Sequence, residues 1–244
     1  MIDALIIFVG AFLGGFVSGL AGFGTALTAL GIWLHVASPK LAAALILCCS
    51  VTAQAQTLPS IWHAIDWRRI WPMLAAGVLG IPIGTWLLAH ADPKLFRLGI
   101  GLILLTFSSV MLAIRARPTM RWGGRPADAA VGFVGGVLGG LAGLSGSLVT
   151  VWATLRGWGK EEKRAIFQAY NTTMLTVAFV VFVASGFVTA EVGKLYLLAL
   201  PGTLSGAFLG VRVYRRVSDN RFHDLVLVVL AFAGASLVWP FVFA

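Results

Sequence analysis

Hydroxyl side chains lie beside glycines in two closely similar stretches of the sequence. One is GLAGFGTALTAL, from Gly19 to Leu30, and the other is GLAGLSGSLVTV, from Gly140 to Val151. Thr25, Ser145 and Ser147 supply hydroxyl donors there, and glycine allows a ligand to approach the backbone closely. If a helix begins just after each glycine cluster, its free N–H groups and positive dipole end add further donors. Two such stretches facing each other would bind a small anion without any buried formal charge.

Polar side chains in two later apolar segments point to the same site. Polar groups in hydrocarbon are costly unless they are paired, so we expect these side chains to face the interior of a helix bundle. Gln168, Asn171 and Thr172 share one helix face because they are spaced by three and four residues. The predicted substrate-binding residues are Gly22, Gly24, Thr25, Gln54, Gly143, Ser145, Gly146, Ser147, Gln168, Asn171 and Thr172.

Other interpretations of these residues remain open at the level of sequence. Small residues at four-residue spacing, such as Gly15 and Gly19, also let helices pack closely, and buried amides also form interhelical hydrogen bonds. Gly143-Leu144-Ser145-Gly146 resembles the nucleophile motif of rhomboid intramembrane serine proteases, whose chemistry needs a histidine within reach of the serine. A membrane assembly protein without transport activity is the third class.

The remaining polar residues offer little catalytic chemistry. All nine Asp and Glu residues lie in loops or at the ends of apolar segments, so no mid-membrane carboxylate suggests a proton or sodium relay. The four histidines lie near segment ends as well, and the chain has no HExxH motif, P-loop or paired-carboxylate motif. We therefore expect no catalytic residue, no metal site and no cofactor.

The composition is that of a polytopic membrane protein. Of the 244 residues, 59% are hydrophobic and 11% are charged, where a soluble domain carries about 25% charged residues. The net charge of +9 comes from basic residues in short loops between apolar segments, which the positive-inside rule explains without nucleic-acid binding. The N-terminus has no Lys or Arg before its apolar run, which favours a retained membrane segment over a cleaved signal.

Two of the eight apolar segments are too long for one crossing. The segments are 3–35, 40–62, 69–90, 94–114, 127–156, 161–185, 192–214 and 222–243. As a single helix, segment 3–35 would be about 50 Å long, against a hydrocarbon core of about 30 Å. We expect breaks at tips 19–24 and 140–146, with helical arms of about 14–16 residues on either side.

The chain is also an internal duplication, which predicts an all-α fold of two repeats. The first repeat would span residues 1–114 and the second 127–244, joined by a basic cytoplasmic linker at 115–126. If each overlong segment crosses the membrane once, the loops divide the Lys and Arg residues 7 against 11; if each turns back as a hairpin, the division is 14 against 4. The positive-inside rule favours the hairpins, and hence inverted repeats of one hairpin and three spans, with both termini outside.

The sequence resembles the sulfite exporter TauE/SafE family of membrane transporters. The resemblance rests on GGFVSGLAGFGTAL at 14–27, GGLAGLSGSLVTV at 139–151 and LGIPIGTWLL at 79–88, and it covers nearly the whole chain. It implies transport of a small sulfur-containing anion, such as sulfite or an organosulfonate, across a bacterial cytoplasmic membrane. The expected partners are this anion and the lipid bilayer, and a homodimer is left open.

Overall fold

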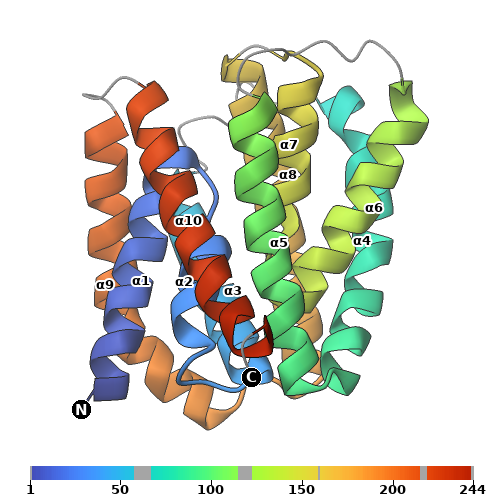
Figure 1. Ribbon diagram of the computed structural model, residues 1–244. Helices are drawn as coiled ribbons and strands as arrows, with labels where there is room; N and C mark the ends of the chain where they lie inside the picture. The colour runs from blue at the N-terminus through green and yellow to red at the C-terminus, as the bar shows by residue number, and fades with distance from the viewer. Residues whose placement is uncertain (1, 58–66, 115–122, 159, 215–218, 243–244) are drawn as a thin grey trace.

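The computed structural model describes residues 2–57, 67–114, 123–158, 160–214 and 219–242. Within these ranges the chain forms ten helices and no strand, arranged as a bundle (Figure 1). The helices are α1 (Ile2–Ala21), α2 (Thr25–Trp33), α3 (Pro39–Thr57), α4 (Trp67–His90), α5 (Pro93–Ile114), α6 (Gly124–Ala142), α7 (Ser145–Leu155), α8 (Lys160–Ala184), α9 (Ala190–Tyr214) and α10 (Asp219–Val242). The expected linker 115–126 is too long at its C-terminal end, because α6 already begins at Gly124, while residues 115–122 lie outside the described ranges.

The first overlong segment turns back on itself. The break between α1 and α2 contains Gly22 and Gly24, whose φ angles of 81° and 106° are left-handed values that residues with a Cβ rarely adopt. After the break α2 runs back along α1. The indole N–H of Trp33, at the end of α2, donates to the carbonyl of Ile7, near the start of α1, at 3.1 Å. Near the break, a methyl group on Gly14 would lie 3.1 Å from the carbonyl oxygen of Thr25. The two helices therefore form a hairpin.

The second overlong segment does the same. Gly143, with φ of 70°, ends α6, and α7 begins two residues later. The indole N–H of Trp152 near the end of α7 donates to the Asp128 carboxylate near the start of α6 at 2.8 Å, while a methyl group on Gly139 would lie 3.0 Å from the Ser145 side chain. The pairing of late with early residues makes this segment a hairpin as well.

The breaks are shorter, and the arms less equal, than the sequence predicts. The helices α1 and α6 have 20 and 19 residues, whereas the returning helices α2 and α7 have 9 and 11. Residues 19–21 and 140–142, which we expected in the tips, are helical because Gly19 and Gly140 are packing positions. A methyl group on Gly19 would collide with the backbone of Ala207 in α9, and one on Gly140 with the backbone of Ile81 in α4.

Glycine-mediated packing joins each hairpin to a helix from the other half of the chain. The long arm α1 lies against α9, and the long arm α6 lies against α4. In both pairs the backbones approach so closely that an added methyl group would strike the partner helix. The matching contacts are Gly15 with Thr203 and Gly19 with Ala207 in the first pair, and Gly136 with Gly77 and Gly140 with Ile81 in the second.

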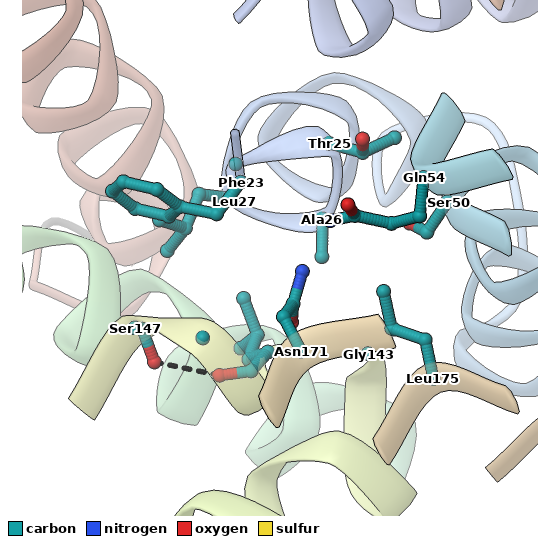
Figure 2. Close-up of a pocket in the computed structure, with 13 residues that line it drawn as sticks. Phe23, Thr25, Ala26, Leu27, Ser50, Gln54, Gly143, Ser147, Asn171 and Leu175 are labelled. Carbon is teal, nitrogen blue, oxygen red and sulfur yellow. Dashed lines mark hydrogen bonds between the residues drawn. The ribbon is translucent and has the colours of Figure 1, made fainter. Parts of the chain in front are cut away.

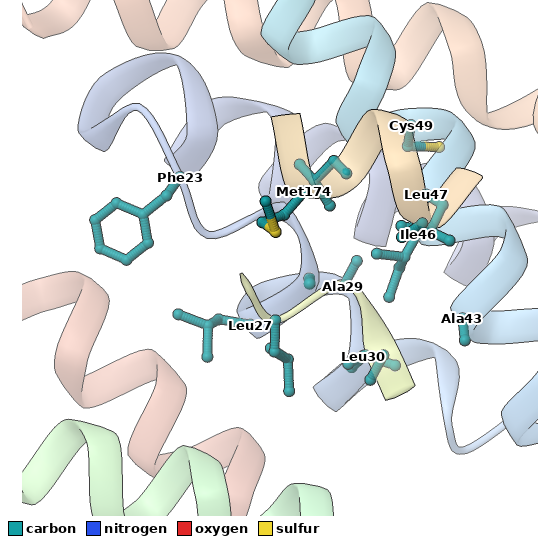
Figure 3. Packing of buried hydrophobic residues seen from close by; sticks show 14 of the residues in the cluster. Phe23, Leu27, Ala29, Leu30, Ala43, Ile46, Leu47, Cys49 and Met174 are labelled. Carbon is teal, nitrogen blue, oxygen red and sulfur yellow. The ribbon is translucent and has the colours of Figure 1, made fainter. Parts of the chain in front are cut away.

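The bundle has apolar side chains on its outer surface and further apolar side chains in its interior. Four described helices contain windows long and apolar enough to cross a membrane: Asp3–Leu20, Ile70–His90, Pro93–Ala113 and Ala190–Val213. Large apolar side chains such as Leu79, Leu197 and Phe232 are exposed. Inside, Leu27, Leu30, Ile46, Leu47 and Met174 pack around the two breaks (Figure 3). The chain is therefore a multi-pass membrane protein whose breaks lie in its packed interior.

Candidate functional site

A small cavity lies where the two breaks meet. Its volume is about 10 Å³, close to the room that one water molecule needs. A methyl group on Gly146 would lie 3.5 Å from the Phe23 side chain, which shows how closely the two tips approach. The lining residues are Phe23, Gly24, Thr25, Ala26, Leu27, Ser50, Gln54, Gly143, Leu144, Gly146, Ser147, Asn171 and Leu175 (Figure 2).

One wall of the cavity is the N-terminus of α2. Gly24 occupies the N-cap position in a left-handed conformation, and no side chain caps the helix. The N–H of Thr28 donates to the Gly24 carbonyl at 3.0 Å and is the first N–H of the helix with an intrahelical acceptor, so the N–H groups of Thr25, Ala26 and Leu27 have none. All three of these residues line the cavity. The wall thus offers backbone donors and the positive end of a helix dipole.

The opposite wall is the N-terminus of α7, which also lacks a side-chain cap. The N–H of Ser147 donates to the Leu144 carbonyl at 3.2 Å and is the first N–H of the helix with such an acceptor, so the N–H groups of Ser145 and Gly146 have none. The Ser147 hydroxyl donates to that same carbonyl at 2.7 Å. Ser147 therefore lines the cavity as predicted, but its hydroxyl proton is used by the backbone.

Asn171 supplies a side-chain donor between the two walls. The Ser145 hydroxyl donates to the Asn171 Oδ1 atom at 2.6 Å. This contact turns the amide so that its Nδ2 group points into the space between the tips, toward Ala26 (Figure 2). Ser145 itself is fully buried and does not line the cavity, so its contribution is to orient Asn171.

Gln54 ties the helix α3 to the first break. Its Nε2 atom donates to the Gly22 carbonyl at 3.0 Å, and Gln54 is 2% exposed. Gly22 is thus an acceptor that holds Gln54 in place and is not itself part of the cavity lining. The bond fixes the position of the break relative to α3, which carries Ser50 and Gln54 into the cavity.

Comparison with known families identifies the family of this chain. The family described as sulfite exporter TauE/SafE matches residues 6–237, which is nearly the entire chain. The chain belongs to the sulfite exporter TauE/SafE family. It is thus a member of a transporter family, and the resemblance seen in its glycine motifs is confirmed. Neither the curated proteins nor the solved structures gave a match.

Besides Gly22 and Ser145, two further predicted site residues of this TauE/SafE chain do not line the cavity. Gln168 is fully buried, and neither amide atom has a partner among the described residues; the Thr172 hydroxyl is also buried without a partner there. Neither residue lines the cavity. Gln168 and Thr172 lie on the same side of α8 as Asn171, as predicted. However, Gln168 precedes Asn171 by three residues, so its side chain is rotated by about 60° around the helix axis relative to that of Asn171.

Sequence reasoning missed part of the lining, although the duplication carried a signal for it. Gly19 and Gly140 align the two halves with an offset of 121 residues. The same offset pairs Ser50 with Asn171 and Gln54 with Leu175, and all four line the cavity. The missed residues are Phe23, Ala26, Leu27, Ser50, Leu144 and Leu175. Apart from Ser50 they contribute apolar surface or backbone groups, which carry no chemical signature in a sequence.

The geometry gives no support to a serine hydrolase. Ser145 donates to Asn171, which cannot act as a general base in the way that histidine does. Two described histidines are engaged elsewhere: a His35 ring nitrogen lies 3.2 Å from the Ser236 hydroxyl, and one of His90 lies 2.9 Å from the Trp86 carbonyl. His63 and the His223 side chain lie outside what the structure describes. Within that part of the chain there is also no group of three metal-ligating residues.

Proposed function

We propose that this protein is a secondary transporter, acting as an exporter, of a small sulfur-containing anion such as sulfite or an organosulfonate. The observation that carries the proposal is the convergence of two uncapped helix N-termini and the Asn171 Nδ2 group on one cavity. Membership of the TauE/SafE family supports the same class of substrate.

The cavity chemistry suits a sulfur oxyanion. Its lining contains no Asp, Glu, Lys or Arg, so an anion would meet backbone N–H groups and neutral donors. Hydrogen bonds to an ionised acceptor are roughly twice as strong as neutral ones. The exposed oxygens of a sulfite or sulfonate can each accept such bonds, which offsets the loss of water around the ion.

The size of the cavity supports alternating access as the transport mechanism. A volume of about 10 Å³ holds one water molecule and not a sulfite, so the tips must move apart to admit substrate. Tight glycine contacts hold α1 against α9 and α4 against α6, and each pair would therefore move as one body. The corresponding contacts in the two halves support inverted repeats that rock about the cavity.

Charge supports an orientation in a bacterial cytoplasmic membrane. The helices α3, α5 and α9 begin near the end of the bundle where α1 begins and α10 ends (Figure 1), and their first two turns contain Lys40, Lys94, Arg97 and Lys194. The other described Lys and Arg residues lie near the opposite end, where α4, α6, α8 and α10 begin. With the richer end in the cytoplasm, both termini lie outside.

Counterflow in proteoliposomes tests this function. Vesicles containing the purified protein are preloaded with sulfite, an organosulfonate, sulfate or acetate and then given the labelled counterpart. We expect exchange specific to sulfite or the organosulfonate, reduced about tenfold or more in Asn171→Ala and unchanged in Gln56→Ala, whose exposed amide lies on α3 outside the cavity. Absence of exchange with every anion, from correctly folded protein, would contradict the proposal.

A further inference from the structure

A second, larger cavity lies near the end of the bundle where α10 ends. Its volume is about 440 Å³, within the range of small-molecule sites. One part of its lining is polar and basic, and the other is apolar. The lining residues are His35, which follows α2; Lys94 and Arg97 from α5; and Ser236, Leu237, Pro240 and Phe241 from α10.

Topology does not account for the basic residues in this outer pocket. In the proposed orientation the outer face carries only four of the thirteen Lys and Arg residues that the structure describes, yet Lys94 and Arg97 both line the same pocket. The positive-inside rule depletes basic residues from this face, so a pair that remains and converges needs another explanation. The most direct explanation is that the two basic residues bind an anion.

The Arg97 guanidinium also has an unused hydrogen-bond donor. Its Nε atom is buried and has no hydrogen-bond partner among the described residues. The carboxylate of Asp92, the nearest acidic residue in the sequence, accepts the backbone N–H groups of Lys94 and Leu95 at 2.8 and 3.1 Å. Asp92 therefore acts as the cap of α5. A buried donor without a partner is unfavourable, and an oxyanion in the pocket would satisfy it.

The outer pocket and the central cavity lie at the two ends of the same short helix. The N-terminus of α2 lines the cavity, and His35, just past its C-terminus, lines the pocket. With nine residues, α2 is about 14 Å long. Between them the helices are in close contact, because a methyl group on Gly101 in α5 would lie 3.0 Å from the Gly234 carbonyl in α10. An anion released outward along α2 would reach the pocket once this contact opened.

We propose that the outer pocket is a second oxyanion site, which holds an organosulfonate between the central cavity and the outer solution. Lys94 and Arg97 bind the sulfonate oxygens, while Leu237, Pro240 and Phe241 contact the carbon part of the molecule. This inference rests on the proposed function. The same chemistry, an oxyanion joined to an apolar body, is found in the phosphate headgroup of an anionic lipid, and the experiment separates the two sources.

Equilibrium binding of labelled ethanesulfonate tests the site in nanodiscs of neutral phosphatidylcholine. We expect wild type to bind two molecules per chain, and Lys94→Gln/Arg97→Gln to bind one. Lys40→Gln/Lys194→Gln, which removes two charges from the same face outside the pocket, should still bind two. Unchanged binding by the pocket variant would rule out an organosulfonate as the occupant, and an equal loss in the control would overturn the site. The single exposed substitution Lys94→Glu provides a second variant should the double one unfold.

The central variant and the lipid distinguish the remaining cases. Asn171→Ala should lose the other molecule; if it binds as wild type does while the pocket variant loses one, the pocket stands and the central site fails. If ethanesulfonate binding is insensitive to the pocket variant, phosphatidylglycerol is measured on the purified proteins. Its retention by wild type but not by Lys94→Gln/Arg97→Gln would assign the oxyanion site to lipid. Equal retention would overturn the site altogether.

Discussion

The two breaks share a backbone device and differ in their side chains. Each follows a long helix, contains glycine in a left-handed conformation and starts a short helix without a side-chain cap. The duplicated register pairs Thr25 with Gly146 and Ser50 with Asn171. The first break is tied to its neighbouring helix by Gln54, and the second by the Ser145–Asn171 contact.

This difference indicates which features bind and which features orient. Backbone N–H groups are present on both sides of the cavity, so in the proposed function the duplicated backbone alone would provide affinity for an anion. The unequal side chains place the Asn171 donor on one side only. A substrate with two different ends, such as an organosulfonate, would therefore bind in one preferred orientation.

The largest expected effect comes from replacing the left-handed glycine at the second break. In Gly143→Ala the methyl group meets both a φ of 70° and the Ile46 side chain at 2.8 Å. We expect loss of counterflow and destabilisation by about 1–3 kcal/mol, measured by thermal unfolding in detergent.

Gly186→Ala is the matched control for that change. Gly186 has nearly the same φ, 71°, but nothing lies within 4 Å of an added methyl group. Gly186→Ala should lose about 1–2 kcal/mol of stability through backbone strain alone, and its transport should be unchanged. Equal loss of transport in the two variants would show that backbone strain, and not the position of the break, is responsible.

The second prediction concerns the orientation of Asn171. Ser145→Ala removes the hydroxyl that holds the Asn171 Oδ1 atom, but leaves the backbone donors of α7 in place. We expect counterflow to weaken about tenfold or less, since a hydrogen bond of this kind contributes about 0.5–1.5 kcal/mol. Complete loss of function at an unchanged unfolding temperature would instead favour chemistry at the serine.

The smallest expected effect is at the first break. Gln54→Leu makes the first half resemble the second, where Leu175 stands at the matching position, and it leaves the Gly22 carbonyl without its partner. The unsatisfied carbonyl should lower stability by about 1–3 kcal/mol, with a change in transport smaller than that of Ser145→Ala. The exposed Gln56→Leu should change neither quantity.

The glycine pattern predicts the location of the breaks because left-handed backbone strongly favours glycine. Gly22, Gly24 and Gly143 adopt such conformations. The sequence could not separate them from Gly19 and Gly140, because the partners of these packing glycines, Ala207 and Ile81, lie on segments distant in the chain. Only the tertiary structure brings these segments together.

Helix bounds followed well from the sequence, and side-chain directions less so. The helix α5 begins at Pro93 and α9 at Ala190, within two residues of the predicted segments, because charge and proline mark the ends of apolar runs. Helical spacing alone placed Gln168 in the site, whereas the structure buries it elsewhere. A small rotation of α8 decides between the two positions, and packing sets that rotation.

The central claim is that the cavity between the breaks binds a sulfur anion through neutral donors, and Asn171→Asp tests it most directly. The substitution keeps the shape of the side chain and replaces the Nδ2 donor with a carboxylate oxygen, which repels an anion. Sulfite and ethanesulfonate binding are measured by equilibrium dialysis, with Gln56→Glu as the same chemical change outside the cavity. We predict that affinity for the central site falls by about 100-fold or more in Asn171→Asp and stays unchanged in Gln56→Glu. Wild-type affinity in a folded Asn171→Asp protein would contradict the account.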